Sequence, residues 1–271
     1  MSLLNRHRQT GATLIELMVG ITIGLLTIAV AIGALMVSRG VATSVSDVTG
    51  LQEQASYAFR IIGQQLRQAG SIRLDLASNK PDGVAIVPED VVAFETIFDS
   101  QNNTIAGLDS PSTLTVGAQA FNEPSFQDAS DPQLIRDCMR QKATLVAGSG
   151  NIRSQFTLNG DQLMCQGSTG AAQAIIRNVS AFQVTYLIQE GAFLGAPTIR
   201  RVNATTAAAD WTRVFGVEVC LDLMGDERID TQGAAAVDAQ YRNCNGTLVN
   251  YGNRTHMVFR NVYQLRGQGR I

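Results

Sequence analysis

The sequence contains few of the residues on which common enzyme chemistry depends. It has two histidines among 271 residues, His7 and His256, and its only lysines are Lys80 and Lys142. A Ser-His-Asp triad needs a histidine as its base, and no Gly-x-Ser-x-Gly motif accompanies His256. Neither lysine follows a glycine-rich phosphate loop. We therefore expect His256 to be a surface or strand-end residue, and we predict no catalytic residue, no cofactor and no small-molecule substrate.

Clusters of basic residues and cation-binding motifs are missing as well. The formal net charge is −2, whereas a nucleic-acid-binding surface needs clustered Lys and Arg, so no nucleic-acid partner is predicted. The acidic segment 222–230 lacks the Asp-x-Asp-x-Asp-Gly spacing of an EF-hand. We interpret this segment as a solvated turn between strands, with calcium binding left open.

The one tryptophan, Trp211, is expected to be an anchor in the core or at its edge.

What the sequence does have is a long apolar segment near its start. Residues 12–37 contain one charged side chain, that of Glu16. A helix of about 20 apolar residues is long enough to cross a bilayer. A carboxylate inside such a helix costs about 2.5–3.5 kcal/mol on insertion scales, and it usually marks a functional site with a partner. Glu16 therefore needs a cation.

The residues around Glu16 resemble the class III signal of type IV prepilins. A short leader with Arg6 and Arg8 precedes Gly11, and residues 11–17 read Gly-Ala-Thr-Leu-Ile-Glu-Leu. The resemblance implies that a prepilin peptidase cuts between Gly11 and Ala12 and methylates the new amine of Ala12. Glu16 is then the fifth residue of the mature chain, where the family has its Glu. Ala12 is a departure, because the family usually has Phe there.

Two other interpretations of this segment remain open. A secretory signal has a shorter apolar core followed by a small-x-small site, and residues 29–31 could serve as that site. An uncleaved anchor explains the length of the segment but not its acid. The Arg residues of the leader favour a cytoplasmic N-terminus, which places the rest of the chain in the periplasm.

The helix is expected to continue beyond the membrane. Apolar or small residues recur every three or four positions after Arg39, which is typical of one helical face, and Gly70 is a plausible end cap. A helix over residues 12–69 would be about 85 Å long, at about 1.5 Å per residue, and its outer part must bury this face. We expect it to pack on the chain's own globular domain, with a juxtamembrane coiled coil as the alternative. The expected stripe comprises Ala42, Val45, Val48, Leu51, Ala55, Phe59, Ile62, Leu66 and Ala69.

Residues 71–271 are predicted to form a β-rich domain with long loops. Short runs of β-branched residues alternate with Gly, Asn, Asp and Pro, and Asn159-Gly160 indicates a hairpin turn. The expected strands are 83–87, 91–97, 113–119, 143–147, 155–158, 174–176, 181–188, 212–223 and 257–265.

All four cysteines lie in this domain, and an even number in an exported domain favours disulfides. Four cysteines allow three pairings, of which we favour the two local ones, Cys138–Cys165 and Cys220–Cys244. Zinc is the alternative, although the sequence contains no Cys-x-x-Cys motif.

Three later segments, 176–186, 213–221 and 257–266, resemble strands of PilW-type minor pilins and of the J-type pseudopilins of type II secretion. The first reads Asn-Val-x-x-Phe-x-Val-x-Tyr from Asn178 to Tyr186. The resemblance implies a pilin-like α+β fold, with a long N-terminal α-helix packed on a C-terminal antiparallel β-sheet domain. The expected divisions are a leader over 1–11, a transmembrane and assembly helix over 12–38, its amphipathic continuation over 39–70 and a periplasmic domain over 71–271.

The resemblance also implies a non-enzymatic function. A PilW-type minor pilin would help to start pilus assembly in a tip or priming complex, with Glu16 paired to the N-terminal amine of a neighbour. Its partners would be the prepilin peptidase, other minor pilins, the major pilin and the inner membrane, and it would end in the pilus fibre. A minor pseudopilin of a type II secretion system is the main alternative, although those proteins are usually more compact. The second alternative is a membrane-anchored periplasmic enzyme or binding protein.

Overall fold

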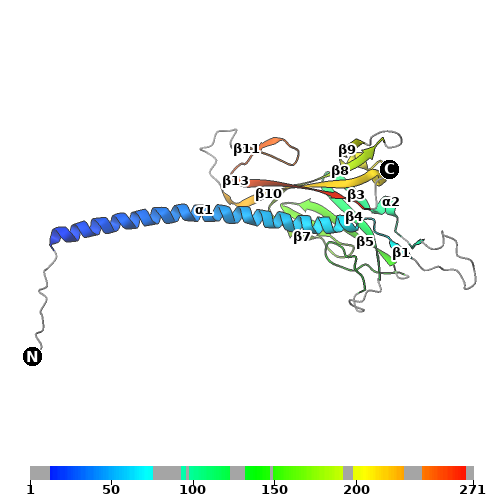
Figure 1. The fold of residues 1–271 in the computed structure, drawn as a ribbon, viewed down its shortest axis with the longest axis horizontal. Coiled ribbons are helices and arrows are strands. Elements are labelled where there is room, and N and C mark those ends of the chain that lie inside the picture. The colour runs from blue at the N-terminus through cyan, green and yellow to red at the C-terminus, as the bar shows by residue number, and fades with distance from the viewer. Residues whose placement is uncertain are drawn as a thin grey trace, which may run out of the picture. The chain divides into compact units, whose positions relative to one another are not determined.

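One long helix is followed by antiparallel strands, which confirms the expected α+β class (Figure 1). The computed structural model describes residues 13–75, 93–95, 98–122, 132–146, 149–191, 198–228 and 240–266. Helix α1 spans Leu14–Gln68. The chain divides into two compact units, Met1–Val48 and Thr49–Ile271, so the second part of α1 belongs to the β-rich unit.

The buried face of α1 begins at Leu51, so the expected stripe is wrong at Ala42 and Val45, which are exposed. Leu51, Ala55, Ile62 and Leu66 of the expected stripe are each at most 2% exposed, and they lie in one core cluster with residues of both larger sheets. Ala58, which the expected stripe does not include, is also fully buried. The second part of the helix thus packs on the chain's own strands, as expected.

Gly70 ends the helix as the sequence predicts. Its φ angle is +69°, which is a conformation that favours glycine at a helix C-terminus. The N–H of Gly70 donates to the carbonyl of Gly117 at 2.9 Å. The chain therefore leaves α1 directly onto the five-stranded sheet.

The first large sheet has four strands in the order β13-β10-β8-β9, all antiparallel. Every second residue of β8 between Phe182 and Ile188 is buried, which is the period-two pattern of a half-buried strand. The central strand β10 is buried along nearly its whole length up to Gly225. The strands are β8 (Val179–Glu190), β9 (Thr198–Val202), β10 (Val214–Arg228) and β13 (Arg254–Gln264).

The second large sheet has five antiparallel strands in simple sequence order, so β3 and β7 are its edges. The strands are β3 (Ile105–Asp109), β4 (Ser112–Phe121), β5 (Ser149–Asn159), β6 (Gln162–Gln166) and β7 (Gln173–Ile176). The smaller elements are β1 (Arg73–Asp75) paired with β2 (Ala93–Glu95), β11 (Gln240–Arg242) paired with β12 (Leu248–Asn250), α2 (Ser100–Asn103), α3 (Ala204–Ala207) and the 3-10 turn Trp211–Arg213.

Most of the longer predicted strands are present. Those at 113–119, 155–158, 174–176, 181–188, 212–223 and 257–265 fall within or largely within β4, β5, β7, β8, β10 and β13. The strand expected at 143–147 is wrong for residues 143–146, which make only an isolated bridge from Val146 to Ser149. The strand at 83–87 lies outside the described residues, and of 91–97 only the three residues of β2 form a described strand.

Strands β3, β6 and β9 of the large sheets were not predicted, and neither were the short strands β1, β11 and β12. In β3, Gly107 interrupts the apolar pattern by which a strand is recognised. The fold needs a glycine there, because a Cβ at this position would collide with the hydroxyl oxygen of Tyr186. A glycine inside a strand often marks such a close approach. The β5–β6 turn also differs from the prediction by one residue. Asn159 pairs with Gln162 as the last residue of β5, and Gly160 has the positive φ, of +60°.

Candidate assembly site

Glu16 caps the start of its own helix. Thr13 donates to Glu16 Oε2 from both its N–H, at 3.0 Å, and its hydroxyl, at 3.1 Å. The N–H of Glu16 donates back to the Thr13 hydroxyl oxygen at 3.3 Å. This is a capping box, in which a Thr and a Glu three residues later satisfy each other's backbone groups. Both bonds to the carboxylate end on Oε2, so the capping box does not use Oε1.

The helix after this cap presents apolar side chains on all sides. Leu14–Met36 is long and apolar enough to cross a membrane by length and composition. Its large side chains are at least half exposed, from 50% at Ile32 to 76% at Leu14. A helix that is hydrophobic all round belongs in a bilayer or in the core of a larger assembly.

Three glycines lie in this segment without any packing need inside the described chain. A Cβ at Gly20, Gly24 or Gly33 would have no atom within 4 Å. Gly20 and Gly24 are four residues apart, so they share one face of the helix, where small residues let a second helix approach closely. The monomer therefore leaves this face available to a neighbour.

The residues of the expected cleavage, Gly11 and Ala12, lie outside the described residues, and so does the leader before them. Thr13 is the first described residue, one position after Ala12. An amine created at Ala12 would thus belong to the same short segment as the capping box.

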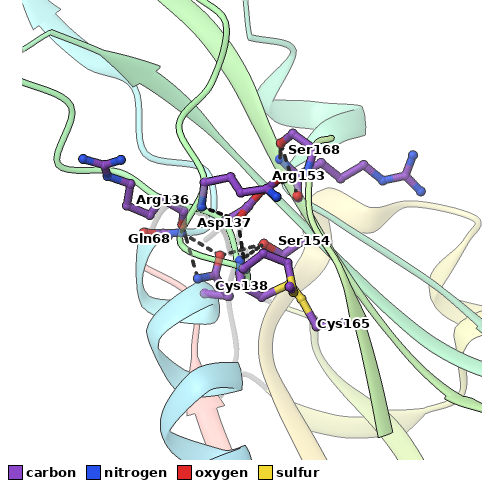
Figure 2. Close-up of a disulfide and its surroundings, with 11 residues drawn as sticks. Gln68, Arg136, Asp137, Cys138, Arg153, Ser154, Cys165 and Ser168 are labelled. Atoms are coloured by element: carbon purple, nitrogen blue, oxygen red, sulfur yellow. Dashed lines mark hydrogen bonds between the residues drawn. A yellow bond between two sulfur atoms is a disulfide. The ribbon is translucent and has the colours of Figure 1, made fainter. Parts of the chain in front are cut away.

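A polar network joins the last turns of α1 to the β-rich domain (Figure 2). The side-chain N–H groups of Gln65 and Gln68 donate to the carbonyl of Arg136 at 3.3 and 2.6 Å. The hydroxyl of Ser154 donates to Gln65 Oε1 at 2.8 Å and accepts from the N–H of Cys138. The network therefore connects α1, the loop at 136–138 and strand β5 through buried and partly buried hydrogen bonds.

Asp137 shapes the loop at the centre of this network. Its carboxylate accepts from the N–H groups of Met139 and Gln141 on one oxygen and from the N–H of Ser168 on the other, at 2.8–2.9 Å. Asp137 is only 1% exposed, and its carboxylate is satisfied by the backbone N–H groups that it holds in place.

The four cysteines form the two local disulfides favoured by the sequence analysis. Cys138 pairs with Cys165 and Cys220 pairs with Cys244. The first bridge ties the Asp137 loop to β6, and the second ties β10 to the turn between β11 and β12. Because all four sulfur atoms are paired, none of them is a zinc ligand.

The expectation that His256 is a surface residue is wrong, although the residue does lie near the start of a strand. This residue lies in β13, and its side chain is 10% exposed and contacts Asp222, whose side chain is 2% exposed. Nδ1 of His256 lies 3.1 Å from Asp222 Oδ1, while the hydroxyl of Tyr241 donates to Asp222 Oδ2 at 2.7 Å. The Tyr241 ring stacks on His256 with centroids 4.5 Å apart. The fold buries this histidine because a carboxylate and an aromatic ring from other strands meet there.

The interpretation of 222–230 as a solvated turn is also wrong for its described part. Residues 222–228 continue β10, and only Asp226, Glu227 and Arg228 are exposed.

Burial of Tyr241 and its hydrogen bond to Asp222 raise the pKa of the Tyr241 hydroxyl group. Within the described chain, His256 contacts Asp222 and the rings of Tyr241 and Tyr251. These contacts hold β11 and β13 against β10.

Trp211 behaves as the expected anchor. It is partly buried, packs against the core and meets the ring of Tyr186 edge to face with centroids 5.0 Å apart. Burial raises the pKa of the Tyr186 hydroxyl. This hydroxyl has no hydrogen-bond partner among the described residues.

Comparisons with known proteins find little. No protein-family model matches the sequence, and no curated protein matches it either. Among solved structures, the chain is similar to a type IV-like pilin from Thermus thermophilus, with 12% sequence identity and a TM-score of 0.39. The match covers 81% of this chain and 98% of that one. At this level of similarity it carries no argument about function.

Sequence reasoning missed several residues of these sites. Thr13 could have been found, because Thr-x-x-Glu before an apolar run is the signature of a capping box. Gln65, Gln68 and Ser154 carry no such signal, because glutamine and serine are ordinary surface residues. Their pairing depends on which backbone groups the loop at 136–138 presents to α1.

Proposed function

We propose that this chain is a minor pilin of the PilW type, which helps to initiate type IV pili and is incorporated into them. The observation that carries the proposal is Glu16, the one charged residue of the apolar segment 12–37, which lies three residues from the capped start of α1 and among exposed apolar side chains. A capping box satisfies hydrogen bonds but leaves the negative charge in place. In an apolar environment this charge still needs a cation.

The cation in this proposal is the N-terminal amine of a neighbouring subunit. A prepilin peptidase cuts between Gly11 and Ala12 and methylates the amine of Ala12. An ion pair between this amine and Glu16 is much stronger in a low dielectric than in water, and it favours one register between adjacent helices. The exposed apolar side chains of 14–36 then pack against other helices, with Gly20 and Gly24 allowing close approach.

The proposed divisions of the chain are a leader over 1–11, an assembly helix over 12–38, its continuation over 39–70 and a domain over 71–271. Before assembly, the N-terminus is cytoplasmic and the domain periplasmic, with 12–38 in the inner membrane. Other minor pilins and the major pilin are the partners, and the subunit needs no cofactor and catalyses no reaction. Two disulfides suit a domain that folds in an oxidising compartment.

The experiment compares Glu16→Gln with Thr13→Ala in cells that make pili. Glu16→Gln keeps an oxygen for the Thr13 bonds but removes the charge, whereas Thr13→Ala weakens the cap and keeps the charge. We expect both variants to be inserted and trimmed, and only Glu16→Gln to fall at least about tenfold in the filament fraction, because leaving an ion pair unmade costs several kcal/mol. Equal losses for the two variants would reduce Glu16 to a capping residue.

A second arm tests the cut. A bulky residue in place of Gly11 should leave full-length precursor in the membrane, and normal trimming of that variant would contradict the proposed site. A deletion strain separates the pilus from a type II secretion system. Loss of pili supports the proposal, whereas retention of exoproteins in the periplasm with normal pili would assign the chain to secretion.

A further inference from the structure

A groove runs along the solvent side of α1 in the β-rich unit. Three adjoining hollows of about 480, 390 and 470 Å³ have Tyr57 in common. The first and third lie between α1 and strand β7, with Ile175 of β7 in both. Tyr57 is 44% exposed, so a large aromatic side chain stands at the centre of the groove.

The strand that lines this groove is the edge of a sheet. Among the described strands, β7 pairs only with β6, and Gln173 and Ala174 are exposed. An exposed edge presents backbone N–H and C=O groups that an extended peptide can pair with. The groove therefore has a sheet edge on one side and a helix on the other, which is a suitable shape for an added strand.

The walls of the groove are held in place. On the helix side, Gln65 and Gln68 bind the carbonyl of Arg136, and the neighbouring loop is fixed by Asp137 and by the bridge Cys138–Cys165. At the other end, Gln54 Oε1 accepts from the N–H of Arg177, just after β7, at 3.2 Å. A site formed before binding does not lose the ordering entropy that a flexible one does.

The largest hollow favours an anionic group. Arg60 and Arg140 line it together with Asp137, whose carboxylate is already occupied by backbone N–H groups. Within the described chain neither Arg60 nor Arg140 is in a salt bridge. The Arg60 guanidinium lies 5.3 Å from the centroid of the Tyr57 ring. Arginine beside an exposed aromatic ring is typical of the residues that dominate binding at interfaces.

We propose that this groove binds an extended, acidic segment of a neighbouring subunit, which adds to the edge of β7 and places a carboxylate between Arg60 and Arg140. This inference rests on the proposed function for the identity of the neighbour. The groove itself is defined by residues of the β-rich unit alone.

The first experiment uses purified full-length protein in detergent and a displayed library of short linear peptides. We expect enriched peptides to contain Asp or Glu within an alternating apolar pattern. Their binding should weaken at least tenfold with Arg60→Glu or Arg140→Glu and stay unchanged with Arg153→Glu, an equal charge change at an exposed residue outside the groove. No enrichment, or equal binding to all three variants, would overturn the proposal.

The second experiment places a photo-cross-linking amino acid at Ala174 in cells, with Ile199 as the control. Ile199 is 65% exposed on β9, the edge strand of the other large sheet. We expect an adduct from position 174 only, mapped by mass spectrometry to an acidic extended segment of a pilus subunit. The absence of that adduct would overturn the proposal that a neighbouring subunit occupies the groove. An adduct to an acidic segment of a protein outside the filament, together with the expected peptide result, would keep the groove and overturn the pilin assignment.

Discussion

At the scale of single residues, a few buried or capping carboxylates join segments that are far apart in the sequence. Asp222 joins Tyr241 of β11 to His256 of β13, and Asp109 joins the end of β3 to the start of α3. Asp109 accepts from the N–H groups of Ala204 and Thr205 and from the Thr205 hydroxyl, at 2.6–2.9 Å. Each of these acids thus links separate elements through directed hydrogen bonds.

We predict that Asp109 contributes to the acid sensitivity of the domain. Desolvation alone would raise the pKa of Asp109, but the bonds from Thr205 and Ala204 together hold it below its ordinary value of 3.8. A lowered pKa in the folded state means that the ionised form stabilises the fold above about pH 4, and that this contribution is lost as the pH falls through the folded pKa.

Asp109→Asn should therefore lower the unfolding temperature at neutral pH and flatten its decline below about pH 4. Thermal unfolding followed by circular dichroism between pH 2 and 7 would measure both effects. Asp161→Asn is a matched control, since Asp161 is an exposed acid in the β5–β6 turn. A decline as steep as that of the unmodified protein would contradict a role for Asp109.

At the scale of elements, α1 packs closely because it has small residues where the strands come near. A Cβ at Gly63 would lie 2.5 Å from Cε1 of Tyr263. The hydroxyl of Tyr263 donates to the carbonyl of Phe59 at 2.8 Å, which holds the ring against the helix. From sequence alone, Gly63 lowers the helix propensity of α1. In the fold it allows the Tyr263 ring of β13 to pack directly against the helix.

Two glycines of α1 allow a matched test. Gly50→Ala meets no atom within 4 Å, so the better helix propensity of Ala should stabilise the domain by up to about 1 kcal/mol. Gly63→Ala gains the same propensity but forces the Tyr263 ring to move, and overpacking costs about 1–3 kcal/mol. We expect the free energy of unfolding in urea to rise or stay equal for Gly50→Ala and to fall by up to about 2 kcal/mol for Gly63→Ala. The same gain from both substitutions would mean that Tyr263 moves aside freely.

At the scale of the whole molecule, the two disulfides brace both large sheets. The bridges close loops with sequence separations of 27 and 24. In the chain-entropy view, a loop of this size is worth about 3.5 kcal/mol, because the cross-link restricts the unfolded chain. Both bridges lie in the β-rich unit, where they fasten loops that have little regular structure of their own.

We therefore predict that the native protein contains no free thiol and that reduction destabilises it. The intact mass should increase by one hydrogen per cysteine on reduction, and the urea midpoint should fall. Cys138→Ser with Cys165→Ser should also loosen the loop held by Asp137, whereas Cys220→Ser with Cys244→Ser should leave that loop unchanged. Hydrogen exchange of the Met139 and Gln141 amides would report this difference, and equal protection in both double variants would contradict it.

The sequence alone determined the features that depend on local composition. Four features depend only on residues that are close together in the chain. They are the apolar segment with its single acid, the end of the helix at Gly70, the buried stripe from Leu51 to Leu66 and the period-two strand β8. Periodic burial and backbone conformation are short-range properties, so they can be predicted without knowing the fold.

Only the tertiary structure decided which distant residues meet. The burial of His256 against Asp222, the network from Gln65 to Ser154, the close approach at Gly63 and the groove beside β7 each join segments that the sequence keeps far apart. Their physical basis is the order of strands in the two sheets and the path of α1 across them. A polar or small residue shows no sign of its partner until the fold has brought that partner within bonding distance.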